Sequence, residues 1–159
     1  MHDIVFPVVG KERVSEIIAH KDDMLLLDSV YSFDGTSLEA GTALDASNPF
    51  FRDGCTPSYV CFELIAQAIC VYSFLAGFNG SEKPQIGFIL KLSDFRIERD
   101  VLRDNERLFI RVECDCSMGT SIFSFKGTVR AGDEMIASGS MLVMSVADPV
   151  AVLGGRLHE

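Results

Sequence analysis

Two side chains in this 159-residue sequence are the candidates for acid–base chemistry, a histidine at position 20 and a glutamate at position 63. His20 is the only histidine far from the chain ends, since the other two are His2 and His158. A histidine exchanges its proton near neutral pH, and a carboxylate in an apolar stretch is suited to act as a general acid. Two structural alternatives stay open: His20 as the cap of a helix, and Glu63 as a carboxylate paired with an arginine or with backbone N–H groups.

Most other kinds of catalytic site are missing from the sequence. It contains no Gly-rich phosphate loop, no His-Glu-x-x-His motif and no serine in a nucleophile elbow. The five cysteines, at positions 55, 61, 70, 114 and 116, include no Cys-x-x-Cys pair, and the one Cys-x-Cys has no histidine nearby. We therefore expect reduced core cysteines in a cytoplasmic protein, without a bound metal.

Charge and hydropathy limit the partners of the protein. The formal net charge of −9 at pH 7 argues against a surface that binds nucleic acid. The N-terminus has neither the basic nor the sustained apolar segment of a signal peptide. Residues 58–76 are apolar and nearly long enough to cross a membrane, but Glu63 and Gln67 lie within them. Because a charge in mid-membrane is costly, we expect a core helix of a soluble domain instead.

The same apolar stretch is predicted to form the central helix of the fold. Thr56 is a suitable N-cap, and Pro57 suits the first helical position, where its missing N–H costs nothing. Gly77 and the pair Asn79-Gly80 are expected to end the helix. The helix is apolar on every side, so we expect it to be buried all round.

The rest of the sequence is predicted to form a sheet around this helix. The expected elements are a short helix at 11–19, hairpin strands at 24–33 and 37–44, and strands at 87–92, around 95–97, and at 107–117, 121–131 and 134–146. The clearest strand alternates apolar Leu108, Ile110 and Val112 with charged Arg111 and Glu113. We predict an α+β fold, a curved antiparallel sheet wrapped around one long central helix. It is expected to form a single domain over 1–159, with its core at about 11–146 and a tail at 147–159.

Three segments of the sequence resemble one enzyme family. The segment Asn48–Ala68 resembles the double phenylalanine, the turn and the Glu-x-x-x-Gln helix of hot-dog-fold 3-hydroxyacyl-(acyl-carrier-protein) dehydratases. The matching residues there are Pro49, Phe50, Phe51, Pro57, Glu63, Ala66 and Gln67. The earlier stretch AHKDDMLLLDSV is similar to the family's opening before its first strand, matching at His20, Leu26, Leu27 and Asp28. The later stretch DFRIERDVLRDNERL resembles its phenylalanine-x-arginine segment.

The sequence departs from that family in one important loop. The fatty-acid enzymes carry their catalytic histidine in a His-Phe-Pro-Gly loop between the double phenylalanine and the helix. Here the loop is shortened to RDGCT and holds no histidine, and Ser58 replaces the glycine that opens the helix. A shortened loop with an upstream histidine resembles the divergent dehydratase branch found with aryl-polyene pigment pathways. His20 would then have to replace the missing imidazole.

The resemblance implies a substrate and a role for each site residue. The substrate would be a 3-hydroxyacyl thioester held on the phosphopantetheine of an acyl carrier protein, and no dissociable cofactor would be needed. His20 would remove the C2 proton, while Glu63 would protonate the departing 3-hydroxyl group. Gln67 would orient Glu63 from the next turn of the helix. Backbone N–H groups near Ser58 and Tyr59 would polarise the thioester carbonyl at the helix N-terminus.

The resemblance also implies protein partners. An acidic carrier protein needs basic contacts, and the densest basic region lies between residues 91 and 111. Arg96, Arg99 and Arg103 are the candidate docking residues, although interleaved acidic residues make a self-paired strand surface equally compatible with the sequence. Hot-dog domains usually pair edge to edge, which implies a homodimer or higher oligomer, or a complex with a second hot-dog subunit.

Two other functions remain compatible with the residues. The first is a hot-dog thioesterase, in which a helix carboxylate activates water on the same class of thioester. The second is a non-catalytic acyl-binding subunit that supports an active hot-dog partner. The products distinguish the thioesterase, which releases free acid and thiol, from the dehydratase, which leaves an enoyl thioester. A distance between His20 and Glu63 too long for one substrate to bridge would favour the non-catalytic subunit.

Overall fold

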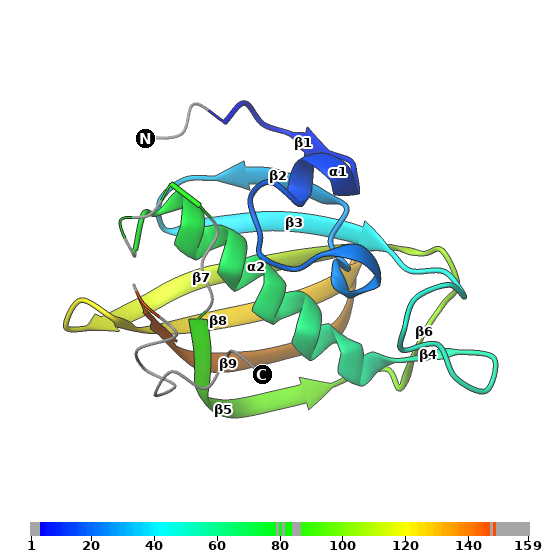
Figure 1. The fold of residues 1–159 in the computed structure, drawn as a ribbon. Helices are drawn as coiled ribbons and strands as arrows, with labels where there is room; N and C mark the ends of the chain where they lie inside the picture. The colour runs from blue at the N-terminus through cyan, green and yellow to red at the C-terminus, as the bar shows by residue number, and fades with distance from the viewer. Residues whose placement is uncertain (1–3, 79, 81, 84–86, 147, 149–159) are drawn as a thin grey trace, which may run out of the picture.

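One sheet and one helix make up most of the computed structural model, which describes residues 4–78, 80, 82–83, 87–146 and 148 (Figure 1). The elements in chain order are β1 (Val8–Val9), α1 (Lys11–Val14), the 3-10 turn η1 (Asp22–Met24), β2 (Ser29–Phe33), β3 (Ser37–Ala43), β4 (Thr56–Pro57), the 3-10 turn η2 (Ser58–Val60), α2 (Cys61–Leu75), β5 (Gly87–Ile97), β6 (Val101–Leu102), β7 (Arg107–Met118), β8 (Ile122–Ala131) and β9 (Glu134–Ser145).

The large sheet is antiparallel throughout and has the strand order β1-β2-β3-β7-β8-β9-β5. The predicted hairpin is confirmed, since β2 and β3 pair across the turn at Asp34-Gly35. The meander of β7, β8 and β9 turns at Gly119 and Gly132, which lie between the strands expected at 107–117, 121–131 and 134–146. Among the described residues, strand β5 lies at one edge of the sheet and pairs with β9 alone.

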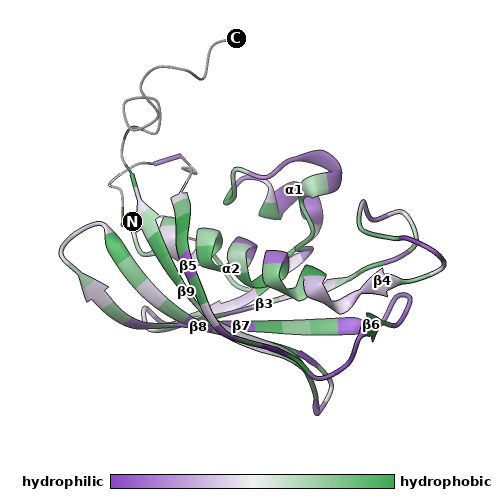
Figure 2. Cartoon of the chain, turned by 90° about the horizontal axis from the view of Figure 1, so that it is seen from below, coloured by the Kyte–Doolittle hydropathy of each residue, from purple (hydrophilic) through white to green (hydrophobic). Residues whose placement is uncertain are grey.

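Helix α2 packs against one face of this sheet, and the strands curve around it (Figure 2). Its sheet-facing residues are almost completely buried; they include Leu64, Ile65, Ala68 and Val71. The contact with β8 is close, because a Cβ atom at Gly127 would lie 2.4 Å from Cγ2 of Ile65. The fold is therefore the predicted α+β hot-dog arrangement of a curved antiparallel sheet around a long helix.

The expectation that the helix is buried all round is wrong. On the side turned away from the sheet, Phe62, Glu63, Ala66, Cys70 and Ser73 are only partly buried. A single sheet covers only one side of a helix, so the other side keeps access to a cleft. The window Ser58–Leu75 is apolar and long enough for a membrane span, but most of it is buried within the fold, as a core helix requires.

The predicted N-cap of the helix is also wrong. Thr56 lies in β4, where it pairs with Leu102, and its hydroxyl accepts a hydrogen bond from the Asn48 side chain. Pro57 has extended backbone angles and precedes η2 instead of opening the helix. The Ser58 N–H donates to the Asp100 carbonyl, so backbone pairing there replaces the expected side-chain cap. The helix ends as predicted before Gly77, which has a φ of 68°.

Some element boundaries differ from the predictions. The first helix covers only residues 11–14, and the strand expected from residue 24 begins at Ser29. The expected strands at 87–92 and 95–97 are one strand, β5, interrupted by bulges. The predicted tail at 147–159 lies outside the described residues except for Asp148, and so does Asn79.

Candidate active site

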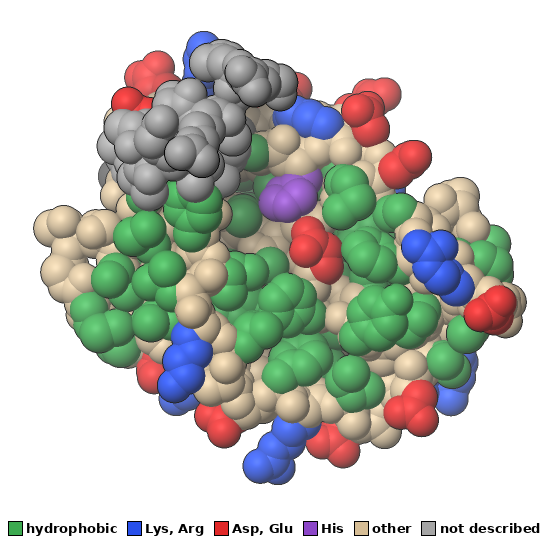
Figure 3. All heavy atoms as spheres, turned by 60° about the horizontal axis from the view of Figure 1, so that its bottom comes forward, with side chains coloured by type: hydrophobic (Ala, Val, Ile, Leu, Met, Phe, Trp, Pro, Cys, Tyr) green, Lys and Arg blue, Asp and Glu red, His purple; other side chains and the backbone are tan. Residues whose placement is uncertain are grey.

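A cleft of about 160 Å³ opens beside the partly exposed side of α2. Its walls come from the segment 17–20, from α2, from the start of β5 and from the end of β9. The lining is mainly apolar and includes Ile17, Ala66, Ile69, Phe88 and Val143. Figure 3 shows a hollow surrounded by hydrophobic side chains, with a histidine and an acidic side chain next to each other at its rim. An apolar cleft with few polar groups is typical of a small-molecule site.

The histidine and the carboxylate that line the cleft are the two residues the sequence singles out. Nε2 of His20 lies 3.4 Å from Oε1 of Glu63. Both side chains are partly accessible, with exposed fractions of 30% and 24%. His20 belongs to the loop between α1 and η1, while Glu63 lies in the first turn of α2. The fold thus brings an imidazole and a carboxylate from separate segments to one accessible point.

Gln67 fixes the orientation of Glu63. Its Nε2 donates to Oε1 of Glu63 at 2.8 Å and to the Met24 carbonyl at 2.7 Å. Its Oε1 accepts from the backbone N–H groups of Leu26 and Leu27, at 3.0 and 3.4 Å. Turning the amide over would place its N–H₂ group against those two N–H donors, so this orientation is set by the backbone. Gln67 must therefore donate to Glu63.

The contacts of Glu63 assign different tasks to its two oxygens. Both Gln67 and His20 approach Oε1. Within the described residues, no hydrogen bond reaches Oε2, so a proton of the neutral carboxyl resides best there, where it can be given to a ligand. For His20, Nδ1 is buried without a hydrogen-bond partner among the described residues. Nε2 is then the nitrogen that takes part in proton exchange.

A thiol lies deeper in the same cleft. Cys70 follows Glu63 by two turns of α2 and lines the cleft. Burial, together with the charge of Glu63, raises the pKa of the Cys70 thiol to about 12. A thiol of that pKa is protonated at neutral pH and is a poor nucleophile. Cys70 therefore acts as an apolar wall residue. No group of three or more His, Cys, Asp or Glu side chains in the described part of the chain is arranged to hold a metal ion.

The structure does not bring Ser58 and Tyr59 to the cleft. Neither residue lines it, and the Ser58 N–H already donates to the Asp100 carbonyl at 2.8 Å. The Ser58 hydroxyl is buried and has no hydrogen-bond partner among the described residues. The side chain of Tyr59 is about half exposed at the surface. Of the predicted substrate-binding residues, only Gln67 touches the acid–base pair.

The three candidate docking arginines have different surroundings. Arg99 is largely covered and makes ion pairs with Glu106 and Glu134. Arg103 is 70% exposed and lies 3.8 Å from Glu134, a distance at which a surface ion pair contributes little. Arg96 is exposed on β5 and has no ion pair within the described residues. Arg96 and Arg103 are therefore the more available cations.

Sequence reasoning missed the walls that the strands supply. Phe88 of β5 and Val143 of β9 line the cleft although neither was a candidate. Their apolar types indicated only a core position, because the sequence does not show that the end of β9 lies beside the start of β5. Sequence reasoning also missed the backbone groups of residues 24–27, which form hydrogen bonds with the Gln67 side chain and hold it in place.

Comparisons with known proteins agree with this architecture. Residues 12–154 match the ApeP-like family, whose description is ApeP dehydratase. No curated protein matches the chain in sequence. Among solved structures, the dehydratase heterocomplex ApeI:P from Xenorhabdus doucetiae is similar, with a TM-score of 0.78, 18% identity, and coverage of 89% of this chain and 95% of that chain.

Two further solved structures show the same fold. A sigma28-regulated virulence protein from Campylobacter jejuni has a TM-score of 0.64 and 10% identity, covering 86% of this chain and 90% of that chain. A hypothetical thioesterase with coenzyme A from Streptococcus pneumoniae has a TM-score of 0.59 and 11% identity, covering 74% of this chain and 84% of that chain. At these identities the structural likeness shows the fold alone.

Proposed function

The chain belongs to the ApeP-like dehydratase family, and from this membership we propose that it removes water from a 3-hydroxyacyl thioester with His20 and Glu63 as the acid–base pair. The observation that carries the proposal is the 3.4 Å approach of His20 Nε2 to Glu63 Oε1 within one chain, at the rim of an apolar cleft. An elimination of water needs one group that takes a proton and one that gives a proton, both close to the substrate.

The reaction can be written with these two groups. Nε2 of His20 takes the proton from C2, and the electron pair of that C–H bond forms the C2–C3 double bond. The C3–O bond breaks as Oε2 of Glu63 gives its proton to the departing hydroxyl, which leaves as water. The step leaves a protonated His20 and an ionised Glu63. The starting state returns when His20 releases its proton and Oε2 of Glu63 takes one up; Oε1, which lies 3.4 Å from His20 Nε2, is the nearest oxygen to receive the proton, and exchange with solvent brings a proton to Oε2.

The remaining parts of the site bind and orient the substrate. The apolar cleft along α2 accommodates the acyl chain, and the thioester is presented on the phosphopantetheine of an acyl carrier protein. Gln67 keeps Oε1 of Glu63 occupied, so that Oε2 stays directed to the substrate. Neither predicted carbonyl donor lines the cleft, and the Ser58 N–H is already bonded to the Asp100 carbonyl. A group from a second subunit is the alternative donor.

A second hot-dog subunit is part of the proposal. The edge strand β5 exposes apolar Ile89, Leu90 and Leu92 by 43, 48 and 40%. An exposed apolar edge strand is prone to pair with another strand, so we propose that it pairs with a second copy or a different hot-dog subunit. The similar structure from Xenorhabdus doucetiae is a heterocomplex, which supports the second form. Arg96 and Arg103 are proposed to dock the acidic carrier protein, with Arg99 holding the local ion pairs.

Mass spectrometry of the acyl chain on its carrier tests this function. The purified chain is incubated with a 3-hydroxyacyl chain on an acyl carrier protein, and the acyl mass is followed over time. We expect the acyl mass to fall by one water while the chain stays attached to the carrier. Release of free acid and a free thiol would instead identify a thioesterase, and an unchanged substrate would favour a non-catalytic acyl-binding subunit.

A further inference from the structure

The carboxylate Glu63 is oriented through Gln67, and Gln67 is oriented by a buried segment that belongs to no helix or strand. Residues 25–27 are fully buried, yet they lie between η1 and β2 and pair with no strand in the described part of the chain. Buried backbone groups need hydrogen bonds, and here side chains supply them. Oε1 of Gln67 accepts hydrogen bonds from the N–H groups of Leu26 and Leu27. The Thr42 hydroxyl donates to the Leu26 carbonyl at 2.5 Å.

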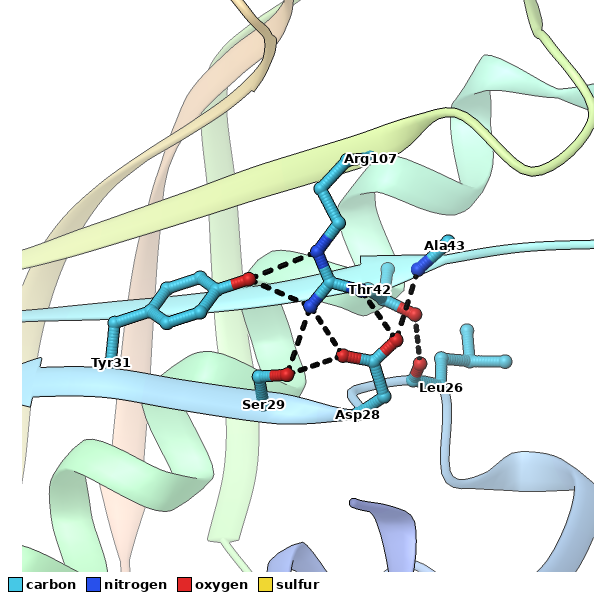
Figure 4. A network of polar contacts seen from close by, with 7 residues as sticks. All are labelled: Leu26, Asp28, Ser29, Tyr31, Thr42, Ala43 and Arg107. Atoms are coloured by element: carbon cyan, nitrogen blue, oxygen red, sulfur yellow. Dashed lines mark hydrogen bonds and ion pairs between the residues drawn. The ribbon is translucent and has the colours of Figure 1, made fainter. Parts of the chain in front are cut away.

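The C-terminal end of this segment is fixed by a second set of contacts (Figure 4). Arg107, the first residue of β7, binds the Asp28 carboxylate with both of its terminal nitrogens, at 2.8 and 2.5 Å. The same carboxylate accepts the Ala43 N–H at 3.2 Å and the Ser29 hydroxyl at 2.6 Å. A two-point contact between a guanidinium and a carboxylate fixes direction as well as distance.

Arg107 itself is held from the other side by a tyrosine. The Tyr31 hydroxyl accepts from Nε and from a terminal nitrogen of Arg107, at 2.9 and 2.7 Å. To reach that position, the Tyr31 ring passes over β3 at Gly41, where a Cβ atom would lie 2.4 Å from the tyrosine oxygen. The network therefore spans three neighbouring strands, β2, β3 and β7, on the face of the sheet opposite α2.

We propose that the Asp28–Arg107 pair is a positioning device for the catalytic carboxylate. It fixes where the segment 25–28 lies, this segment fixes the side-chain amide of Gln67, and Gln67 fixes which oxygen of Glu63 faces the substrate. Arg107 does not touch the cleft, so it acts only through these contacts. The proposal extends the dehydratase function above, but its structural part can be measured without any reaction.

The matched control for Arg107 is Arg111. Both arginines lie on the same face of β7, and Arg111 forms an ion pair with Glu39 of β3 at 3.0 Å. That pair makes no contact with the segment 25–28 or with Gln67. Exchanging either arginine for glutamine therefore removes one cross-strand ion pair, but only Arg107→Gln removes the support of Asp28.

Nuclear magnetic resonance of the Gln67 side-chain amide is the first readout. The two N–H signals are assigned by their loss in a Gln67→Met variant. We expect Arg107→Gln to shift these signals in the folded protein and Arg111→Gln to leave them in place. The signals come from folded molecules only, so a lower fraction of folded protein does not imitate the shift. Arg107→Lys keeps a charge with fewer hydrogen bonds and is expected to give a smaller shift, which provides a test if the glutamine variant does not fold.

Steady-state kinetics are the second readout. We expect kcat to fall about tenfold to a hundredfold in Arg107→Gln, because small displacements of a catalytic group have effects of this size, while KM changes less than about twofold. In a Gln67→Met background the same substitution should cause no further loss, because the route to Glu63 is already interrupted.

The outcomes separate this inference from the proposed function. Unchanged Gln67 signals in Arg107→Gln and in Arg107→Lys, or equal shifts in Arg111→Gln, would overturn the positioning role. The positioning role would also be overturned if Arg107→Gln lowered kcat by the same factor in the Gln67→Met background as in the wild type. If the wild-type protein had no dehydratase activity, the proposed function would be wrong. Shifted Gln67 signals in Arg107→Gln would still support the positioning of Glu63 by Arg107.

Discussion

Nε2 of His20 lies 3.4 Å from Oε1 of Glu63, although the two residues come from a loop before η1 and from helix α2. In the fatty-acid dehydratases that the sequence resembles, the catalytic histidine lies in a loop that is shortened here to RDGCT and holds no histidine. Here an upstream histidine of the same chain occupies a position from which it can serve this purpose. The missing loop histidine therefore does not by itself indicate an inactive subunit.

Replacing Gln67 tests the polar link between the helix and the segment 24–27. Gln67→Met leaves two buried N–H groups and the Met24 carbonyl without their partner. Since a buried unpaired polar group costs about 1–3 kcal/mol, we expect the free energy of unfolding to fall by about 2–4 kcal/mol. Denaturant unfolding measures it, with Ser73→Ala on the same helix as the control. A loss below about 0.5 kcal/mol, the range of neutral surface changes, would contradict the network.

A bulky residue at position 70 tests the acyl cleft. Cys70 lies about 10 Å beyond Glu63 along α2, so a short acyl chain ends before it and a long one must pass it. We expect Cys70→Phe to lower kcat/KM for a 3-hydroxydecanoyl substrate at least about tenfold. The value for a 3-hydroxybutanoyl substrate should change little. Equal losses for both substrates, or none for either, would show that the chain does not lie along this wall; Cys116→Phe, at an exposed position, is the control.

The Asp28–Arg107 pair predicts a stability difference that depends on pH. Burial alone would raise the pKa of Asp28, but the hydrogen bonds from Arg107 and Ser29 outweigh it, so the pKa is lowered. A carboxyl whose pKa is lowered by folding stabilises the protein above its unfolded pKa, and this contribution is lost as the pH falls through the folded value. Asp28→Asn should therefore reduce the free energy of unfolding at pH 7 by about 1–2 kcal/mol, a modest amount because the pair is partly exposed.

Unfolding curves of wild type and Asp28→Asn over a range of pH provide the measurement. The difference between the two proteins should be constant from neutral pH down to about pH 5 and should shrink below about pH 4, where Asp28 takes up a proton. A difference that stays constant down to about pH 2, or that grows with acidification, would show that the carboxylate form of Asp28 is not what stabilises the fold.

The exposed apolar side chains of edge strand β5 predict where a second subunit binds. Leu90 is exposed on β5, whereas Val9 is exposed on β1 at the opposite edge. If β5 forms the interface, Leu90→Glu should convert a dimer of the purified chain to a monomer, and Val9→Glu should leave the dimer intact. Light scattering after size-exclusion chromatography measures the mass. Dissociation by Val9→Glu alone would place the interface at the other edge.

Much of the fold follows from local patterns in the sequence. The alternation of Leu108, Ile110 and Val112 with residues of the other face, such as Arg111 and Glu113, predicts a strand with one buried face, and β7 has it. The apolar run before Gly77 predicts the central helix. What the sequence does not show is which side of this helix stays open, because that depends on how far one sheet can curve around it. The cap at Thr56 failed for a related reason, since pairing with Leu102 is a long-range contact.

The sequence predicts the two acid–base residues of the candidate site, but not the contacts that hold them in place. The scarcity of histidine singles out His20, and the apolar surroundings in the sequence single out Glu63. The role of Asp28 and Arg107 was not predictable from spacing, because their contact crosses an intervening strand. Arg107 was one basic residue among several in a mixed stretch. Only the folded arrangement shows that its partner is the end of the segment that holds Gln67.

We propose that His20 and Glu63 of one chain act as a single acid–base pair, and single and double variants distinguish this pair from two independent groups. Dehydration rates of wild type, His20→Ala, Glu63→Gln and the double variant are measured on a carrier-bound 3-hydroxyacyl chain. Each single variant should lose about 10²–10⁴-fold in kcat, with its thermal unfolding unchanged, and the double variant should be no slower than the worse single one. Wild-type rates in either single variant, or losses that multiply in the double variant, would contradict the pair.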